Sequence, residues 1–514
     1  MAAAVVLAAT LRIWGLDYGI PHPTIRPDEE RLVGRAQTIF ATGNWHPGSF
    51  YYPSLPFYID TLALHGYYRA QELVGRYESP FDFLFDIAVS RPGLHYRIGR
   101  AVSAVAGTMT VLAAFVLSLS AYRRPAAAIL AAFSLAVCHL HVRDSHFATV
   151  DVLMTLFVTL SLVFAVRAAR SASRVDFALA GAFAGLAISS KYNAGLVLAS
   201  ISAAAFLKRP FAFGRLALAA LAAALAFALT SPYVLLRFAA FWNDMSFLQD
   251  FLYGSSTSEP ALFSHLRTTL PYGFGWPLFV ASALGLVRAL WLRRPSDVVL
   301  LSFAIPFLAL VSSVRITFPR YLLPVTPLLL VLAADFVAFV LEKIPRARLL
   351  AAAGTAAFLL APTLLDSIAF DAIAARDDTR LQAAFFISEN FAPRTWLVVC
   401  EGYGAPPVNQ DRRRPPAFVV EEMDCMKESP LPSDAAFLVT HEHRELRAFS
   451  RVHPALGSRL EEKAVLVASF DPYRGSSSVE PVFYGSDAFY VPFAGFEAVE
   501  RGGPIVKIWK LPFD

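Results

Sequence analysis

The chain has 514 residues, of which 56% are hydrophobic and 17% charged, and its mean hydropathy is +0.50. An ordinary soluble enzyme of this length is excluded, because such proteins are only about 45–50% apolar. The formal net charge is +5, and the basic residues fall mainly in short loops between apolar segments. We therefore interpret the pI near 9.0 as a sign of membrane topology and expect no nucleic-acid partner.

Apolar segments recur along most of the chain and predict a polytopic α-helical membrane protein with about 11 transmembrane helices. The segments are residues 2–16, 97–121, 126–141, 148–166, 176–190, 194–207, 214–231, 275–292, 298–314, 321–341 and 349–369. A spanning helix needs about 20 residues, so the shorter segments must borrow flanking residues. Segment 2–16 lacks the basic start and a good cleavage site of a signal peptide, and we expect it to be retained.

Basic residues fall in every second gap between these segments. They are Arg123 and Arg124; Arg167, Arg170 and Arg174; Lys208, Arg209 and Arg215; Arg293 and Arg294; and Lys343, Arg346 and Arg348. An excess of Lys and Arg in short loops marks the cytoplasmic side of a membrane. Residues 17–96, 142–147, 232–274, 315–320 and those after about 370 are therefore predicted to lie outside. The expected location is the plasma membrane or cell inner membrane, with any chemistry on the extracytoplasmic (periplasmic) side.

The first external loop, residues 17–96, is long for a connector and rich in aromatic and charged residues. Within it, Pro53 to Arg69 and Phe81 to Val89 are predicted to form amphipathic helices on the membrane surface. The run Arg26-Pro27-Asp28-Glu29-Glu30-Arg31 favours a helix start, with proline in the first helical position and acids in the first turn. The carboxylates of Asp28 and Glu29 are also placed to take a proton from an acceptor, and both interpretations stay open.

A second polar group lies where the third and fourth spans meet outside. It contains His139, His141, Arg143, Asp144, His146 and Asp151. An ionisable residue such as Asp151 inside an apolar span indicates function, although a structural ion pair or hydrogen bond to Arg143 or a neighbouring helix would also explain it. The histidine spacing matches no metal signature, so we expect no cofactor; a divalent metal is left open but not favoured.

Five cations oppose the positive-inside trend, each near the outer end of a span. They are Arg97, Arg100, Lys191, Arg315 and Arg320. Snorkelling to the interface would explain any one of them. A convergent set of Arg and Lys at the outer leaflet suits a phosphate or pyrophosphate anchored in lipid, because Arg offers bidentate contacts and Lys a compact charge.

Residues 375–514 predict a small external domain of α/β or mixed β type. Short apolar runs typical of strands are Trp396–Val399, Ala436–Thr440, Lys463–Phe470 and Ile505–Leu511, separated by polar stretches such as Asp411–Pro416. This part carries no catalytic signature. Cys400 and Cys425 could form a disulfide if their compartment is oxidising, but the sequence does not decide it.

Several motifs in order along the chain resemble the GT-C glycosyltransferases. They are Asp28-Glu29, Phe147-Ala-Thr-Val-Asp151, Gly185-Leu-Ala-Ile-Ser-Ser-Lys191-Tyr192, Ser231-Pro232-Tyr233 and Phe318-Pro319-Arg320-Tyr321-Leu-Leu-Pro324. The nearest branch is that of the protein O-mannosyltransferases and lipid A aminoarabinose transferases, and the likeness covers roughly residues 1–340. The chain departs from the family by extra sequence at about 70–95, and it lacks recognisable lumenal sugar-binding repeats, which weakens the case for a protein acceptor.

The resemblance implies transfer of a sugar from a polyprenyl-phosphate donor in the outer leaflet to an extracytoplasmic lipid, glycan or protein, with inversion at the anomeric carbon. It implies a catalytic transmembrane domain at residues 1–370, followed by the external domain at 375–514. Asp28 would be the general base or acceptor orienter, supported by Glu29. Lys191 and Arg320 would neutralise the leaving phosphate, as would Arg97, Arg143 or Arg315. Residues that would shape the site or the acceptor position are Asp151, His146, Tyr192, Tyr233, Tyr321 and Tyr52.

Two other classes of protein stay open. One is a transporter or flippase for a lipid-linked sugar, and the other is a non-catalytic assembly factor of the cell envelope. Transporters usually place their site near mid-membrane, on broken helices from internal repeats. No internal repeat is recognisable here, and the charges gather at one face of the predicted bundle, which favours an enzyme.

Overall fold

A computed structural model describes residues 1–208, 211–254, 260–344, 348–409, 418–430, 432, 435–475 and 477–512. These residues form two compact units. Unit 1 comprises Met1–Ile13, Leu32–Ala63 and Gly99–Ile368, and unit 2 comprises Trp14–Arg31, Leu64–Ile98 and Ala369–Asp514.

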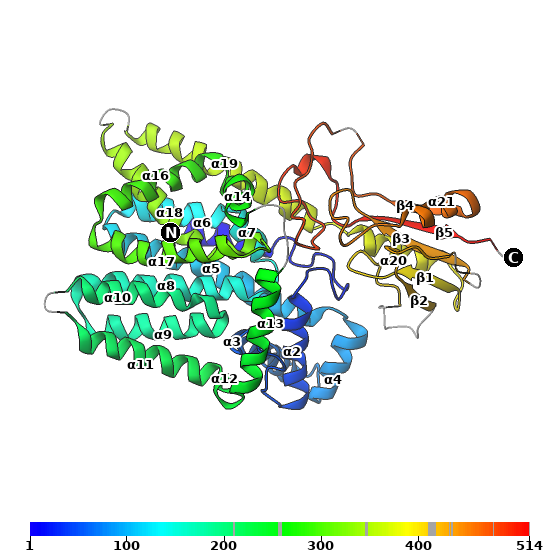
Figure 1. Ribbon diagram of the computed structural model, residues 1–514, viewed down its shortest axis with the longest axis horizontal. Helices are drawn as coiled ribbons and strands as arrows, with labels where there is room; N and C mark the ends of the chain where they lie inside the picture. Colours follow the sequence, from blue (N-terminus) through cyan, green and yellow to red (C-terminus); the bar gives the residue numbers. More distant parts are fainter. Residues whose placement is uncertain are drawn as a thin grey trace. The chain divides into compact units, whose positions relative to one another are not determined.

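Unit 1 is built mainly from long helices, and each predicted apolar segment overlaps one of them. In chain order they are α1 (Ala2–Ile13), α5 (Leu94–Tyr122), α6 (Pro125–Val137), α8 (Val150–Ser171), α9 (Arg174–Ser190), α10 (Leu198–Phe206), α11 (Phe213–Thr230), α16 (Trp276–Leu292), α17 (Pro295–Ser313), α18 (Thr326–Glu342) and α19 (Arg348–Ala374). Figure 1 shows α8, α9, α10 and α11 running side by side.

Six helices among the described residues are long and apolar enough to cross a membrane. A seventh span is counted if Ala261–Phe274 and Trp276–Leu292, which meet at an angle of 116°, are taken as one broken span. Three further apolar helical stretches are shorter: Ala2–Ile13, Pro125–Val137 and Tyr192–Phe206. The chain is therefore a multi-pass helical membrane protein, as the sequence predicts.

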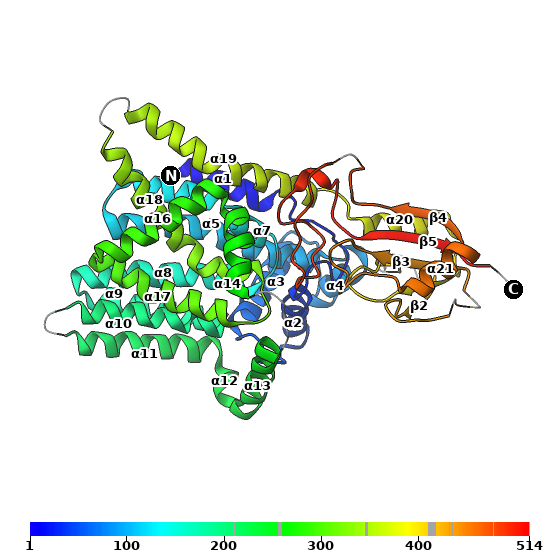
Figure 2. The ribbon, with the colours of Figure 1, turned by 45° about the horizontal axis from the view of Figure 1, so that its top comes forward.

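Short elements connect or flank these helices. They are α2 (Glu29–Thr42), α3 (Leu55–Leu73), α4 (Pro80–Phe85), the π-helical turns η1 (Asp86–Ser90) and η3 (His265–Thr269), the 3-10 helices η2 (Tyr192–Val197) and η4 (Pro319–Val325), α7 (His139–Asp144), α12 (Pro232–Leu236), α13 (Phe238–Gly254), α14 (Ala261–Ser264) and α15 (Leu270–Phe274). Figure 2 shows α12 and α13 following α11 in the chain. Both helices predicted in the first external loop form, as α3 and as α4 with η1. The predicted helix start also forms, but α2 begins at Glu29, so Pro27 lies before the helix rather than in its first position.

Close packing in unit 1 depends on two glycines of α9. A Cβ atom at Gly181 would collide with the backbone carbonyl of Ala219 on α11, and one at Gly185 with the carbonyl of Ala223. Glycines spaced four residues apart let two helix backbones approach closely, and van der Waals contact then holds the helices together where lipid offers no hydrophobic drive.

Some basic residues in or near the loops predicted to be cytoplasmic form ion pairs that join helices of unit 1. Arg124 Nη1 lies 3.2 Å from Asp335 Oδ1 and Arg294 Nη2 lies 2.8 Å from Asp335 Oδ2, while Arg288 also pairs with this buried carboxylate. One carboxylate on α18 thus joins the ends of α6, α16 and α17. Arg209 and Arg346 lie outside the described residues, as does the side chain of Arg348.

Unit 2 contains a five-stranded mixed sheet of order β2-β1-β3-β5-β4 (Figure 1). The strands are β1 (Trp396–Cys400), β2 (Val419–Met423), β3 (Phe437–Glu442), β4 (Val465–Phe470) and β5 (Ile505–Lys510). β1 is parallel to β2 and β3, and β5 is antiparallel to β3 and β4. Four strands form where the sequence predicts them. The prediction missed β2, because this edge strand is almost wholly exposed and two of its five residues are acidic. The predicted separator Asp411–Pro416 lies outside the described residues.

Helices α20 (Thr379–Asn390) and α21 (Pro454–Lys463) cover opposite faces of this sheet, and a short 3-10 helix, η5 (Phe496–Ala498), precedes β5. Ala383 and Ile387 of α20 pack with Leu397 and Val399 of β1. Leu456 and Leu460 of α21 pack with Val398 and Cys400, the alternate residues of the same strand. This alternation is what a strand with two buried faces requires, and it confirms the predicted α/β domain.

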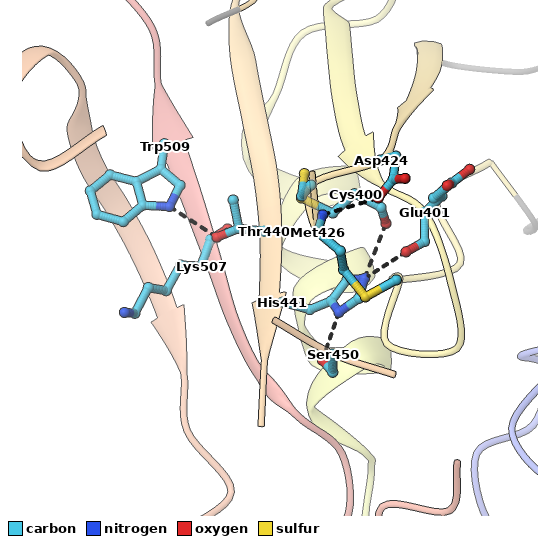
Figure 3. The surroundings of a disulfide bond; sticks show 10 residues. Cys400, Glu401, Asp424, Met426, Thr440, His441, Ser450, Lys507 and Trp509 are labelled. Carbon is cyan, nitrogen blue, oxygen red and sulfur yellow. Dashed lines mark hydrogen bonds between the residues drawn. A yellow bond between two sulfur atoms is a disulfide. The ribbon is translucent and has the colours of Figure 1, made fainter. Parts of the chain in front are cut away.

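A disulfide joins Cys400 at the end of β1 to Cys425 after β2, with 5.3 Å between the Cα atoms. His441 of β3 lies close by (Figure 3). Its Nε2–H donates to the backbone carbonyls of Cys400 and Glu401, at 3.2 and 3.1 Å, and its Nδ1 accepts from the Ser450 hydroxyl at 2.6 Å. Both ring nitrogens are therefore satisfied by a neutral imidazole. Burial lowers the pKa of His441 to about 4.

We expect unit 2 to lose stability as the pH falls from about 6.5 to about 4. Above pH 6.5 His441 is neutral in the folded and unfolded chain; below it, only the unfolded chain gains a proton readily. The loss at pH 5 should be about 2 kcal/mol for this residue. Thermal unfolding of the protein in nanodiscs at pH 7 and pH 5 measures it. His441→Asn, which does not titrate, should be less stable at pH 7 but show a smaller fall. Equal falls in both proteins would contradict the assignment.

Candidate active site

Two cations of unit 1 meet at one carboxylate. Asp151 lies in the first turn of α8, Lys191 directly follows the last residue of α9, and Arg320 is the second residue of η4. Lys191 Nζ lies 2.7 Å from Asp151 Oδ1, and Arg320 Nε lies 3.7 Å from Asp151 Oδ2. The structure thus brings together three of the residues singled out from the sequence. Asp151 forms the ion pair that the structural interpretation expected, and its partners are the two leading phosphate-binding candidates.

Aromatic rings support both cations. Lys191 Nζ stands 4.7 Å from the centre of the Tyr321 ring, and the Arg320 guanidinium lies 4.4 Å from that of Phe318. Such cation–π contacts fix a charge without neutralising it. The two cations at one carboxylate bring an ammonium and a guanidinium together, and these are the donor groups that bind an anion such as a phosphate.

Unpaired polar atoms and hydroxyls surround the chain segment that carries Lys191. Tyr192 Oη and Asn193 Oδ1 are buried and have no hydrogen-bond partner among the residues that the structure describes. Nearby in sequence, the Ser189 hydroxyl lies 2.7 Å from that of Ser231. Ser54 N–H donates to the same Ser231 oxygen at 3.1 Å. Sequence reasoning did not single out Ser54, Ser189 or Asn193; the runs Ser-Ser-Lys and Ser-Pro-Tyr were the only signals.

The other three cations predicted to bind the donor phosphate are Arg97, Arg143 and Arg315. Arg97 belongs to unit 2 and is exposed, with its Nε 2.6 Å from Asp17 Oδ1. Arg143 is buried and its Nη1 lies 3.2 Å from Asp144 Oδ2. Arg315 is exposed between α17 and η4. Their predicted part in phosphate binding stays a prediction.

The predicted site-shaping aromatic and histidine residues of unit 1 are distributed as follows. Tyr192 packs edge-on against Phe241, Tyr233 against His46, and Tyr52 lies in the loop before α3. His146 is buried, and its Nδ1 lies 2.9 Å from the Val142 carbonyl. His141 Nδ1 lies 2.9 Å from Arg12 Nη2. Among the described residues no three His, Cys, Asp or Glu side chains are grouped so as to hold a metal ion.

The predicted acidic motif lies in unit 2 and has an unusual backbone. Asp28 adopts φ = +73°, in the left-handed region that few residues other than glycine enter. Such a conformation costs about 1–3 kcal/mol and persists only where its surroundings enforce it, often at functional sites. Glu29 is fully buried. Burial raises the pKa of Glu30, and the neighbouring Asp28 charge raises it further.

The residues before Asp28 are anchored to the C-terminal part of unit 2. Arg26 Nη1 lies 2.5 Å from Asp487 Oδ1, with both side chains almost completely buried. The Tyr18 hydroxyl donates to Asp378 Oδ2 at 2.6 Å, and His22 Nε2 donates to the Ala405 carbonyl at 2.9 Å. These three contacts fix the segment that leads into Asp28. None of them could be read from the sequence, because each joins residues more than 350 positions apart.

Comparison with known proteins gives a family match and a shared fold. Residues 93–236 match the family model described as dolichyl-phosphate-mannose-protein mannosyltransferase. No curated protein sequence matches the chain.

The fold is similar to that of ArnT from Cupriavidus metallidurans, both in its crystal structure with undecaprenyl phosphate (TM-score 0.56) and in its apo state (0.57). In both, sequence identity is 16% over 99% of this chain and 97% of that one. An oligosaccharyltransferase from Archaeoglobus fulgidus, solved with a tethered acceptor peptide, has a TM-score of 0.53 at 13% identity, over 99% of this chain and 88% of that one.

At these identities the solved structures show the shared fold alone. The family-model match covers α5 through α12 and includes Asp151, Lys191, Ser231 and Tyr233, four positions of the motifs quoted above. It bears out the predicted resemblance over residues 93–236, and the solved structures add a shared fold.

Proposed function

We propose that the protein transfers a sugar from a polyprenyl-phosphate donor to an extracytoplasmic acceptor, with inversion at the anomeric carbon. The observation that carries the proposal is the pair of cations, Lys191 and Arg320, held at Asp151 and at two aromatic rings. The structure of ArnT with undecaprenyl phosphate supports a carrier of this chemical class. So does an archaeal oligosaccharyltransferase structure containing a dolichol-phosphate.

The proposed reaction is a single displacement. The acceptor oxygen or nitrogen bonds to the anomeric carbon while the bond from that carbon to the phosphate oxygen breaks. Polyprenyl phosphate leaves with the electron pair, and Lys191 and Arg320 stabilise its growing negative charge. Asp28 takes the acceptor proton or orients the acceptor, with Glu29 in support. Arg97, Arg143 and Arg315 are further candidates for phosphate contact.

We also propose how the chain is arranged across the membrane. Eleven spans would place the basic loops in the cytoplasm, with residues 1–370 forming the catalytic domain and 375–514 an external domain. The Cys400–Cys425 disulfide supports this arrangement, because disulfides persist in oxidising compartments outside the cytoplasm. His146, Tyr52, Tyr192, Tyr233 and Tyr321 would shape the acceptor side of the site.

Donor consumption tests the proposal. Purified protein in nanodiscs would be given a panel of radiolabelled polyprenyl-phosphate sugars, and release of polyprenyl phosphate would be measured. We expect one donor to be consumed, and we expect Lys191→Gln to lower the rate about 100-fold, as loss of one charge-stabilising donor does in other active sites.

Lys343→Gln is the matched control. Lys343 also lies near a helix end, with its Nζ 4.5 Å from the centre of the Phe339 ring, but it belongs to a loop predicted to be cytoplasmic. Its substitution should leave the rate unchanged. If wild-type protein consumes no donor, or moves it across the membrane intact, the transporter interpretation replaces this one.

A further inference from the structure

Unit 2 contains a cavity of about 390 Å³ at the β2 edge of its sheet. Val399 of β1 and Val420 and Glu422 of β2 line it. In the parallel register Val399 lies opposite Glu422, on the sheet face that α20 covers. Residues 402–408, the loop that leaves the carboxyl end of β1, supply much of the remaining wall. Crevices at the carboxyl ends of parallel strands are common ligand sites, and the volume falls within the range of about 300–1,000 Å³ found for small-molecule pockets.

The segment that carries the acidic motif also lines this cavity. His22 and Thr24 form part of its wall. His22 is neutral: its Nε2 donates to the Ala405 carbonyl, its Nδ1 accepts from the Thr24 N–H at 3.1 Å, and burial lowers its pKa to about 3. Asp28 lies four residues after Thr24, on the same anchored stretch of chain.

Tyr403 lines the cavity and is also affected by the charges of the acidic motif. Burial raises the pKa of its phenol, and the charges of Glu30 and Asp28 raise it further, so these acids lie within electrostatic reach of the cavity wall. Glu30 Oε2 is buried and has no hydrogen-bond partner among the described residues.

The described residues that line the cavity include one acid, Glu422, and no Lys or Arg, so the wall disfavours an anion. His22 is neutral, and beyond the wall Asp28 and Glu30 raise the pKa of Tyr403 while Arg31 lowers it. Proline and valine provide apolar wall, while Thr24 and Tyr403 provide hydroxyls. A sugar ring has apolar faces and a polar edge. A wall that combines apolar residues, hydroxyls and one acid therefore suits a sugar that is uncharged or that carries an amino group.

We propose that this cavity holds the acceptor, as a hydroxyl- or amine-bearing sugar whose bound end carries no phosphate. The inference rests on the proposed transferase function and adds to it the chemical class of the acceptor and the residues that select it.

The first experiment measures binding without catalysis. Full-length protein in nanodiscs would be titrated with glucose, glucosamine and glucose 6-phosphate, and binding followed by saturation-transfer NMR. We expect glucose and glucosamine to bind at least 10-fold more tightly than glucose 6-phosphate. Glu422→Lys should remove this preference, whereas Glu421→Lys, on the same exposed edge strand but facing the opposite side of the sheet, should keep it. Equal binding of all three sugars to wild-type protein, or binding of none, would overturn the proposal.

A second pair of variants tests occupancy. Val420→Trp fills the cavity from an exposed strand, and Val419→Trp places the same side chain on the other face. We expect Val420→Trp alone to weaken glucosamine binding and to lower sugar transfer at least 10-fold, with undecaprenyl phosphate bound as tightly as by wild type. Equal effects of both variants would reject the acceptor site. If wild-type protein transfers no sugar at all, the proposed function fails, while the binding results still decide whether the cavity is a sugar site.

Discussion

Asp28→Asn is expected to reduce sugar transfer about 100- to 10,000-fold without unfolding the protein, because removal of a general base typically has an effect of this size. Asparagine matches aspartate in size and also tolerates the left-handed conformation that residue 28 adopts at φ = +73°. The loss should therefore come from the missing carboxylate and not from a distorted loop. Transfer of radiolabelled sugar at matched expression, together with the unfolding temperature, measures both effects.

Two further variants sharpen this test. Glu389→Gln removes an exposed carboxylate elsewhere in unit 2 and should leave transfer unchanged. Asp28→Ala puts a residue with no local hydrogen-bonding ability into the left-handed region and should also lower stability. If Asp28→Asn transfers sugar at the wild-type rate, Asp28 is not the base, and the assignment moves to another carboxylate such as Glu30.

Asp487→Asn is expected to destabilise unit 2 by about 3–5 kcal/mol, because it removes the negative charge from a buried ion pair with Arg26. Arg26 and Asp487 are almost completely buried and 2.5 Å apart. The same change should slow transfer, since Arg26 lies two residues before Asp28 and helps to fix its backbone. Thermal unfolding and the transfer rate at a temperature where the variant is folded give the two readouts.

An exposed ion pair of the same unit supplies the control. Arg459 and Glu428 are 3.1 Å apart with side chains 39% and 63% exposed, and Glu428→Gln should cause no measurable change, as is usual for surface pairs. The double variant Arg26→Met with Asp487→Leu replaces both charges by apolar groups and should recover stability. If it also recovers transfer, the ion pair contributes only stability and does not position Asp28.

The membrane part of the fold was predictable because hydropathy and loop charge act over short stretches of sequence. Each of the eleven apolar segments overlaps a helix, and Lys191 and Arg320 stood out because cations at outer helix ends oppose the positive-inside trend. That both meet at Asp151 follows from packing between three separate elements, which no local pattern encodes. The sequence offered Arg143 or a neighbouring helix as the partner of Asp151, and did not single out Lys191 or Arg320 in that role.

Unit 2 was less predictable because long-range contacts determine it. The anchors Arg26–Asp487 and Tyr18–Asp378 join the first external loop to the C-terminal part of the chain. β2 escaped prediction because Glu421 and Glu422 interrupt its apolar run, and an edge strand needs no buried face. The left-handed backbone of Asp28 is likewise set by its surroundings and not by its own residue type.

Unit 2 has a consequence for the order in which the protein is assembled during synthesis. Its residues come from three stretches, Trp14–Arg31, Leu64–Ile98 and Ala369–Asp514, so its first part leaves the ribosome long before its last. Asp378, Ala405 and Asp487, which fix the acidic segment, are made only after every helix of the membrane bundle. Closing a loop of this length is slow and must precede the contacts that stabilise it. The acidic segment therefore reaches its final conformation last, and a chain cut short before the sheet carries Asp28 without the contacts that hold it.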